Sequence, residues 1–188
     1  LDKVTMANGM VTKLNPQTFI DFNAIAKGYA VDVIAQFLEN RGIKNYLVEI
    51  GGEIHVRGIN QVKSTAWTVG IDEPNFDGTQ SVLKAISLKD QAMATSGTYR
   101  KFKIDENGKR FAHIIDATTG YPSKSNILSV SVLAKDCMTA DAYATAFQAM
   151  GVENVSYFLQ SHPELEVFLI FENDRQELET LALNGFPE

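Results

Sequence analysis

Cysteine is almost absent from this sequence of 188 residues, in which Cys137 is the only one. A single cysteine excludes an internal disulfide framework and leaves the redox compartment open. Long hydrophobic runs are absent too, and each apolar stretch is far too short to cross a bilayer as a helix. The formal net charge is −6, and the sequence has no clustered basic segment. This excludes a broad nucleic-acid footprint, so any bound phosphate must be held locally.

Familiar catalytic motifs are also missing. The sequence contains no GxSxG, Walker A, HExxH, CxxC or GxGxxG segment, which argues against the common hydrolase, P-loop, zinc and dinucleotide-binding classes. No initiator methionine or signal-like stretch leads the chain, so we expect a trimmed or truncated product.

The sequence does contain enough apolar residues for one sizeable core. With 45% hydrophobic residues, the chain fits a single domain over residues 1–188. Strands are expected at 46–50, 53–58, 66–71, 82–88, 99–104, 110–115, 128–134 and 166–171, and helices at 139–150 and 152–160. Because helices interrupt a largely antiparallel series of strands, the predicted fold class is α+β.

Residues 21–32, DFNAIAKGYAVD, are the most informative segment and open a further predicted helix. Apolar residues at three- and four-residue spacing extend this helix to about Asn40, with Gly42 as its left-handed cap. The expected buried stripe consists of Ile25, Ala26, Tyr29, Ala30, Val33, Ile34, Phe37 and Leu38. Lys27 and Gly28 lie off that stripe, so packing alone does not explain them. Free N–H groups at a helix opening, with a lysine beside them, predict an anion site.

The helix predicted at 139–150 carries the segment TADAYATAF, in which Asp141 and Thr145 are four residues apart. This spacing places both side-chain oxygens on one helical face, about one turn apart. A carboxylate and a hydroxyl on one face suit a hard cation such as Mg²⁺, which prefers oxygen ligands and leaves room for substrate phosphates.

Two further segments are candidates for function. His113 is expected in a strand that ends at a turn, a place where functional side chains often lie. The segment MATSGTY at 93–99 offers hydroxyls and backbone N–H groups around Gly97, either as a ligand-facing loop or as a plain turn. His55 and His162 have no carboxylate or second histidine at a useful spacing, which favours structural roles for both.

Each candidate also has a structural alternative. Lys27 can be a solvated surface lysine, and Asp21 can be an N-terminal cap. Asp141 can satisfy the dipole of its own helix, while Thr145 packs by its methyl group and His113 is simply packed in its strand.

Five segments together resemble one known family. DFNAIAKGYAVD, YLVEIGGEIHVRG, MATSGTYRKF, HIIDATTGYPS and TADAYATAFQAMG occur in the order seen in the ApbE family of FAD:protein FMN transferases. The resemblance extends from about Thr12 to the C-terminus. It implies an ApbE-like α+β fold and Mg²⁺-dependent transfer of FMN from FAD to a threonine or serine of a target protein, with release of AMP. The alternatives are an FAD pyrophosphatase, which gives FMN and AMP, and a non-catalytic flavin-binding protein.

The resemblance also implies roles for individual residues. The backbone carbonyl of Ala24 and the side chains of Asp141 and Thr145 match protein ligands of Mg²⁺. Asp21, Lys27 and Ile115 match contacts to FAD. His113, beside Ile115, is the candidate proton-transfer group, because an acceptor hydroxyl must lose its proton during the attack.

Some positions depart from the family pattern. Some relatives carry a second aspartate immediately before the threonine, where this chain has Ala144, so one possible metal-site carboxylate is lost. Many have Gly-Gly in place of Asn23 and Ala24, and a proline in place of Ala117. Relatives also have a substantial N-terminal region with further flavin contacts, and we expect this chain to begin after it.

The family resemblance implies a cellular setting as well. Relatives are usually exported and often lipid-anchored in bacteria, so the full-length protein is expected to be periplasmic or a membrane-anchored lipoprotein. The expected partners are FAD and an acceptor protein, commonly a membrane-associated electron-transfer protein, with no nucleic acid.

Overall fold

A six-stranded sheet forms the centre of the computed structural model, which describes residues 3–98, 102–104, 110–112, 114–116, 119–123 and 125–187. The strand order is β12-β11-β10-β7-β4-β3, and every neighbouring pair is antiparallel. Its strands are β3 (Tyr46–Ile50), β4 (Glu53–Arg57), β7 (Gln91–Gly97), β10 (Ile127–Ala134), β11 (Glu166–Glu172) and β12 (Leu178–Leu183). The predicted α+β class with a largely antiparallel sheet is therefore confirmed.

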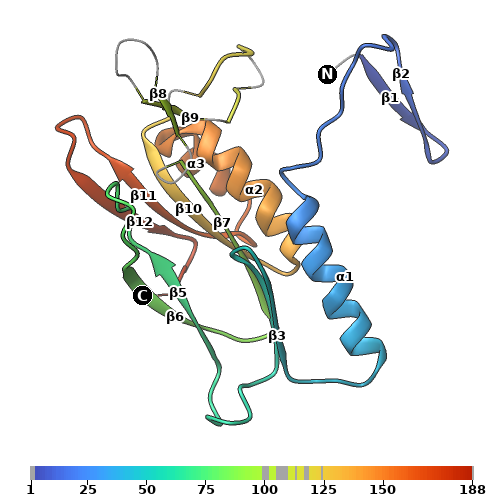
Figure 1. The fold of residues 1–188 in the computed structure, drawn as a ribbon, viewed down its shortest axis with the longest axis vertical. Helices are drawn as coiled ribbons and strands as arrows, with labels where there is room; N and C mark the ends of the chain where they lie inside the picture. The colour runs from blue at the N-terminus through green and yellow to red at the C-terminus, as the bar shows by residue number, and fades with distance from the viewer. Residues whose placement is uncertain are drawn as a thin grey trace.

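Helices cover one face of this sheet, and a hairpin covers the other (Figure 1). The helices are α1 (Ala26–Asn40), α2 (Cys137–Met150) and α3 (Val152–Leu159), and the hairpin consists of β5 (Trp67–Asp72) and β6 (Val82–Leu88). Successive residues of a strand point to opposite faces. Ala92 and Ala94 of β7 accordingly pack on the helix side, whereas Met93 packs on the hairpin side.

Two smaller hairpins complete the described chain. β1 (Val4–Ala7) pairs with β2 (Met10–Lys13) and stands apart from the main sheet in Figure 1. β8 (Phe102–Ile104) pairs with β9 (Arg110–Ala112), which confirms the hairpin expected in that part of the sequence. Strands β1, β2, β7 and β12 were not predicted. No helix in the described part of the chain is long and apolar enough to cross a membrane.

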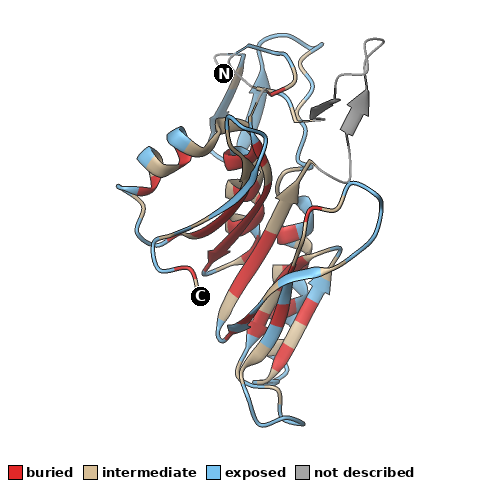
Figure 2. Cartoon of the chain, turned by 90° about the vertical axis from the view of Figure 1, so that its left-hand side faces the viewer, coloured by how far each residue is buried: buried red, intermediate tan, exposed pale blue. Residues whose placement is uncertain are grey.

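The predicted buried stripe of α1 is wrong for most of its residues, although Leu38 packs against the core. Gly28, Val31 and Ala35 are the buried residues of this helix. Figure 2 shows that buried residues are concentrated in the strands of the sheet. The exposed apolar residues are Tyr29 (58%), Val33 (49%), Ile34 (41%) and Phe37 (52%). Because α1 is apolar on more than one face, periodicity alone does not select the buried one. The small residues do, since they allow the closest approach of a neighbouring helix.

The ends of α1 agree with the prediction at one terminus only. The helix ends at Asn40, and Gly42 adopts a left-handed conformation with a φ of 76°, as expected. At the other end, Ile25 is the N-cap residue and provides no side-chain hydrogen bond. Asp21 is therefore not the cap: its Oδ1 accepts from the backbone N–H of Asn23 at 2.7 Å, within the preceding turn.

Residues 93–97 of the segment MATSGTY are not in a loop, because residues 91–97 form β7, a central strand of the sheet. Its hydroxyls point to neighbouring elements. Thr95 Oγ1 lies 2.8 Å from Ser131 Oγ of β10, and Ser96 Oγ lies 3.2 Å from Thr145 Oγ1 of α2. Through Ser96, this strand reaches the helix face that carries the predicted metal ligands.

Candidate functional site

Gly28 is the point at which α1 and α2 approach most tightly. A Cβ atom at this position would lie 2.4 Å from the carbonyl oxygen of Cys137 and 2.8 Å from Cβ of Asp141. Both distances are shorter than real Cβ contacts, and one of the two neighbours is backbone that cannot easily move. Only glycine fits here. Packing therefore explains Gly28, contrary to our prediction from the sequence.

The backbone N–H of Gly28 donates a hydrogen bond to Asp141 Oδ2 at 2.9 Å. In a continuous helix, this N–H would pair with the carbonyl of Ala24, four residues earlier. The neighbouring helical bonds run from Ala26 N–H to the carbonyl of Phe22 and from Tyr29 N–H to the carbonyl of Ile25, both at 2.9 Å. Asp141, whose residue is only 3% exposed, is thus directed to the opening of α1.

Burial raises the pKa of Asp141, and the hydrogen bond from Gly28 and the positive charge of Lys27 oppose this rise only in part. A buried carboxylate gains stability when it meets opposite charge or further donors. A cation near Asp141 would supply that charge.

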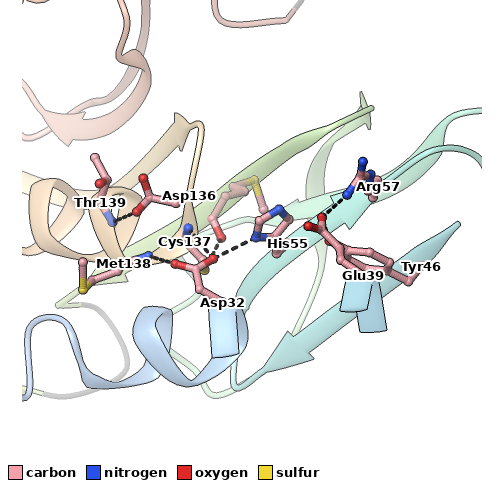
Figure 3. A network of polar contacts seen from close by, with 10 residues as sticks. Asp32, Glu39, Tyr46, His55, Arg57, Asp136, Cys137, Met138 and Thr139 are labelled. Atoms are coloured by element: carbon pink, nitrogen blue, oxygen red, sulfur yellow. Dashed lines mark hydrogen bonds and ion pairs between the residues drawn. The ribbon is translucent and has the colours of Figure 1, made fainter. Parts of the chain in front are cut away.

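A second carboxylate, on α1, accepts hydrogen bonds from the backbone of α2, whereas Asp141 of α2 accepts from the backbone of α1. Asp32 of α1 accepts hydrogen bonds from the backbone N–H groups of Cys137 (2.9 Å) and Met138 (2.8 Å), which begin α2 (Figure 3). His55 Nδ1 lies 2.8 Å from Asp32 Oδ1. The N-cap residue Asp136 adds a bond from its own helix, because its side chain accepts from Thr139 N–H at 2.8 Å.

These contacts determine the ionisation of Asp32. Burial alone would raise its pKa, but the bond with His55 and the two backbone N–H groups outweigh burial and lower it. His55 therefore has a carboxylate partner, which the sequence did not reveal because the two residues are 23 positions apart. Its role is structural, as predicted, since it supports the carboxylate that begins α2.

Lys27 forms an ion pair with Glu53, the first residue of β4. The lysine side chain is 50% exposed, whereas that of Glu53 is only 2% exposed. Burial raises the pKa of Glu53, and the negative charge of the nearby Asp141 raises it further. The ion pair with Lys27 opposes this rise only in part. Sequence reasoning missed Glu53, although it lies in the segment YLVEIGGEIHVRG. The signal was an acidic residue directly after two glycines, at the start of a strand in which Ile54 and Val56 alternate with polar residues.

Thr145 lies one turn after Asp141 on α2, and its hydroxyl contacts Ser96. Thr145 also lines a pocket of about 460 Å³ together with Ile115, so the structure brings these two predicted site residues to one cavity. Ala144 is fully buried within the apolar cluster between α2 and the sheet. Position 144 thus faces the core in this chain.

The structure does not join Asp21 to this group, and it does not describe His113. Asp21 is exposed, and its carboxylate oxygens accept from the backbone and side-chain nitrogens of Asn23 at 2.7 and 3.1 Å. His113 lies outside the described residues. The structure therefore brings the N-terminal parts of α1 and α2 into contact, but it does not test the roles predicted for Asp21 and His113.

The oxygen donors around α1 and α2 suit Mg²⁺ with an anionic substrate. Within the described ranges, no group of three or more His, Cys, Asp or Glu residues is placed to hold a metal. The predicted set has one carboxylate, Asp141, with the Thr145 hydroxyl and the Ala24 carbonyl as neutral donors. Mg²⁺ is commonly bound by one or two carboxylates plus substrate phosphates, so this set fits it in the presence of a diphosphate.

Most of this chain is similar to curated proteins of one kind. The chain is 40% identical over 174 residues to an FAD:protein FMN transferase of Vibrio cholerae, a match that covers 93% of this chain and 51% of the relative. It is 39% identical over 178 residues to an FAD:protein FMN transferase of Haemophilus influenzae, again covering 93% of this chain and 51% of the relative. The chain thus spans about half the length of these curated relatives.

Solved structures and a family model also match this chain. The flavin transferase ApbE from Vibrio cholerae superposes with a TM-score of 0.85 at 36% identity, over 98% of this chain and 57% of that one. The ApbE protein from Thermotoga maritima superposes with a TM-score of 0.79 at 28% identity, over 95% of this chain and 56% of that one. The model of the ApbE family matches residues 1–169. The chain belongs to the ApbE family.

Proposed function

We propose that this protein is a Mg²⁺-dependent FAD:protein FMN transferase, which attaches FMN from FAD to a threonine or serine of a target protein and releases AMP. The observation that carries the proposal is the hydrogen bond between Gly28 and Asp141. It joins the Lys27 segment of α1 to the Asp141–Thr145 face of α2, so one site can hold both a diphosphate and its cation. The names of the relatives supply the flavin chemistry.

In this proposal, Lys27 and the opening of α1 bind the diphosphate of FAD, since both supply positive charge to an anion. Ala24, through its carbonyl, and Asp141 and Thr145, through their side chains, would hold Mg²⁺. When bound, the metal neutralises the diphosphate and makes its phosphorus more electrophilic. Asp141 would then be fully ionised, because the cation offsets the cost of its burial.

The transfer step forms one bond and breaks another. The oxygen of the acceptor hydroxyl attacks the phosphorus on the FMN side of the diphosphate, and the P–O bond to AMP breaks. The hydroxyl proton leaves to a base, for which His113 is our candidate, as in the sequence analysis. Lys27 stabilises the charge that develops on the leaving AMP phosphate.

The remaining assignments concern the flavin nucleotide and the setting. Ile115 lines the pocket next to Thr145 and is proposed to contact FAD there, with Asp21 as a second contact. The acceptor is proposed to be a membrane-associated electron-transfer protein, and the full-length protein to be periplasmic or lipid-anchored. Both proposals rest on the family resemblance.

One assay tests this function. The protein is incubated with FAD, Mg²⁺ and a domain that carries an acceptor threonine, and AMP release and flavin attachment are followed by chromatography and mass spectrometry. AMP with covalently attached FMN is the expected result. AMP with free FMN would replace the proposal with FAD hydrolysis, and binding of FAD without AMP would indicate a non-catalytic flavin-binding protein. A parallel reaction with EDTA should lose activity.

A further inference from the structure

We infer that Glu53 is a positioning residue for Lys27: its buried carboxylate fixes the lysine ammonium group at the opening of α1, ready for the FAD diphosphate. This inference rests on the proposed function and adds a residue to it. Glu53 lies on β4, whereas Lys27 lies on α1, so the ion pair links the helix opening to the sheet.

The chain turn before β4 directs Glu53 inward. Gly51 and Gly52 have φ values of 63° and 103°, a region that favours glycine. A Cβ atom at Gly51 would lie 3.8 Å from Glu53 Oε2 and 3.9 Å from Lys27 Cδ. The aliphatic stem of the lysine therefore passes over Gly51 on its way to the carboxylate, so the glycine turn shapes the path of Lys27.

Stability alone is a weak reason for this ion pair. Burying two charges requires their desolvation, and apolar side chains of similar size often stabilise a fold as well or better. One oxygen of Glu53, Oε2, is buried and has no hydrogen-bond partner among the described residues. Such a group lowers stability, so its presence calls for a role outside folding. Orientation of Lys27 supplies that role.

A lysine side chain loses more of its mobility to such a partner than most side chains do. Its long side chain has many rotamers and is half-exposed here, so a free Lys27 would spend little time in any one orientation. An ammonium group that is held in place before substrate binds should bind a diphosphate more strongly than a mobile one, because it does not have to be ordered on binding. With one N–H engaged by Glu53, the ammonium group keeps two donors for phosphate oxygens.

The charge of Glu53 acts against its positioning role, and this makes the inference testable. A negative carboxylate near the site repels the FAD diphosphate, so Glu53→Gln would tighten binding if only net charge mattered. If Glu53 positions Lys27, the same change weakens binding. The sign of the effect separates the two possibilities.

The first experiment is a double-mutant cycle on this protein with Glu53→Gln, Lys27→Met and both changes together. We expect Glu53→Gln to raise the KM for FAD about 10-fold, the equivalent of one misplaced charge-assisted hydrogen bond, with a smaller change in kcat. Glu53→Asp should recover part of this loss. The double variant should bind FAD no worse than Lys27→Met alone, because Glu53 acts through Lys27. Tighter binding by Glu53→Gln, or additive losses, would overturn the inference.

The second experiment does not depend on activity. The protein is acetylated with an N-hydroxysuccinimide ester, and the rate of acetylation of Lys27 is measured by peptide mass spectrometry relative to that of other lysines. The rate should rise at least about 3-fold in Glu53→Gln, because the ammonium group is released, and should stay unchanged in Glu49→Gln, an exposed carboxylate on the same hairpin. An unchanged Lys27 rate would refute the link. If the unaltered protein released no AMP, the proposed function would fail, while this measurement would still decide the role of Glu53.

Discussion

Asp32 and Asp141 lie at similar places in the two helices that face each other. Each is in the second turn of its own helix, and each accepts backbone N–H groups at the beginning of the other helix. Their surroundings differ. Asp32 bonds with two N–H groups and with His55, and its pKa is lowered. Among the described contacts, Asp141 accepts only from Gly28, and its pKa is raised.

The difference separates a structural carboxylate from one that is available for a ligand. Asp32 has its charge compensated by the protein, so it can serve the fold without any bound species. Asp141 is buried with less compensation, which makes its ionised form costly until a cation or donor arrives. The two helices therefore use the same residue type for different purposes, and hydrogen-bond partners distinguish them.

The largest expected effect is the loss of activity when Asp141 is neutralised. Asp141→Asn keeps an oxygen that can accept from Gly28, but it removes the charge proposed to bind Mg²⁺. AMP release should fall at least about 100-fold, while the thermal midpoint stays the same or rises, since a costly buried charge is gone. Activity assays and calorimetry of the two proteins provide the comparison. Retained Mg²⁺-dependent turnover would place the metal elsewhere.

Gly28→Ala should produce the largest loss of stability. The added Cβ would overlap backbone of α2 at Cys137, so the helices must separate and the bond to Asp141 must lengthen. We expect a loss of about 2–4 kcal/mol in the free energy of unfolding, the range of severe overpacking. Urea unfolding measures it, with Gln36→Ala on the exposed side of α1 as the control. A change below about 0.5 kcal/mol would mean that the helices are not in close contact.

Val31 and Val33 provide a matched test of which side of α1 packs on the site. Val31 is 0% exposed and Val33 is 49% exposed. Val31→Ala should cost about 1.5–3 kcal/mol of unfolding free energy, the value of a fully buried valine, whereas Val33→Ala should cost about 0.5 kcal/mol or less. Equal losses at both positions in chemical denaturation would show that the buried face is assigned wrongly.

Asp32→Asn should have the smallest effect, about 1–2 kcal/mol at pH 7, which is typical of a lost helix cap. Because the folded pKa of Asp32 lies below its ordinary value of 3.8, the ionised form stabilises the fold above that value. This contribution disappears as the pH falls through the lowered pKa. The difference between the two proteins should therefore shrink as the pH falls below about pH 4. A difference that grows below that pH would contradict the assignment.

The class of fold and most of its elements could be predicted from the sequence, but the central strand β7 was taken for a loop or turn. Alternating apolar residues mark strands such as β6, and the spacing of Ala140, Ala144 and Phe147 marks the buried side of α2. These patterns are local. The edge strand β12 was missed, because its mixed burial leaves a weak alternation. The face of α1 was assigned wrongly, because large apolar residues occur on both of its sides.

The contacts that make the site were less predictable. Asp141 and Thr145 were recognised as one helical face, and Lys27 as a charge at a helix opening, from spacing alone. That Asp141 would bond to Gly28 depends on how two helices pack, and no local pattern encodes it. The pairs Asp32–His55 and Lys27–Glu53 join α1 to β4, and they too become visible only after folding.

The Gly28–Asp141 contact has a consequence for synthesis of the protein, because its two residues are 113 positions apart. At roughly 5–20 residues per second, Asp141 leaves the ribosome about 6–23 s after Gly28. During that interval, α1 lacks the helix that Gly28 contacts, and Lys27 lacks the nearby carboxylate of Asp141. Contacts between distant segments also form slowly, because a long loop must close first. The contact between the two helices therefore forms late, after strands β3, β4, β7 and β10 have been synthesised.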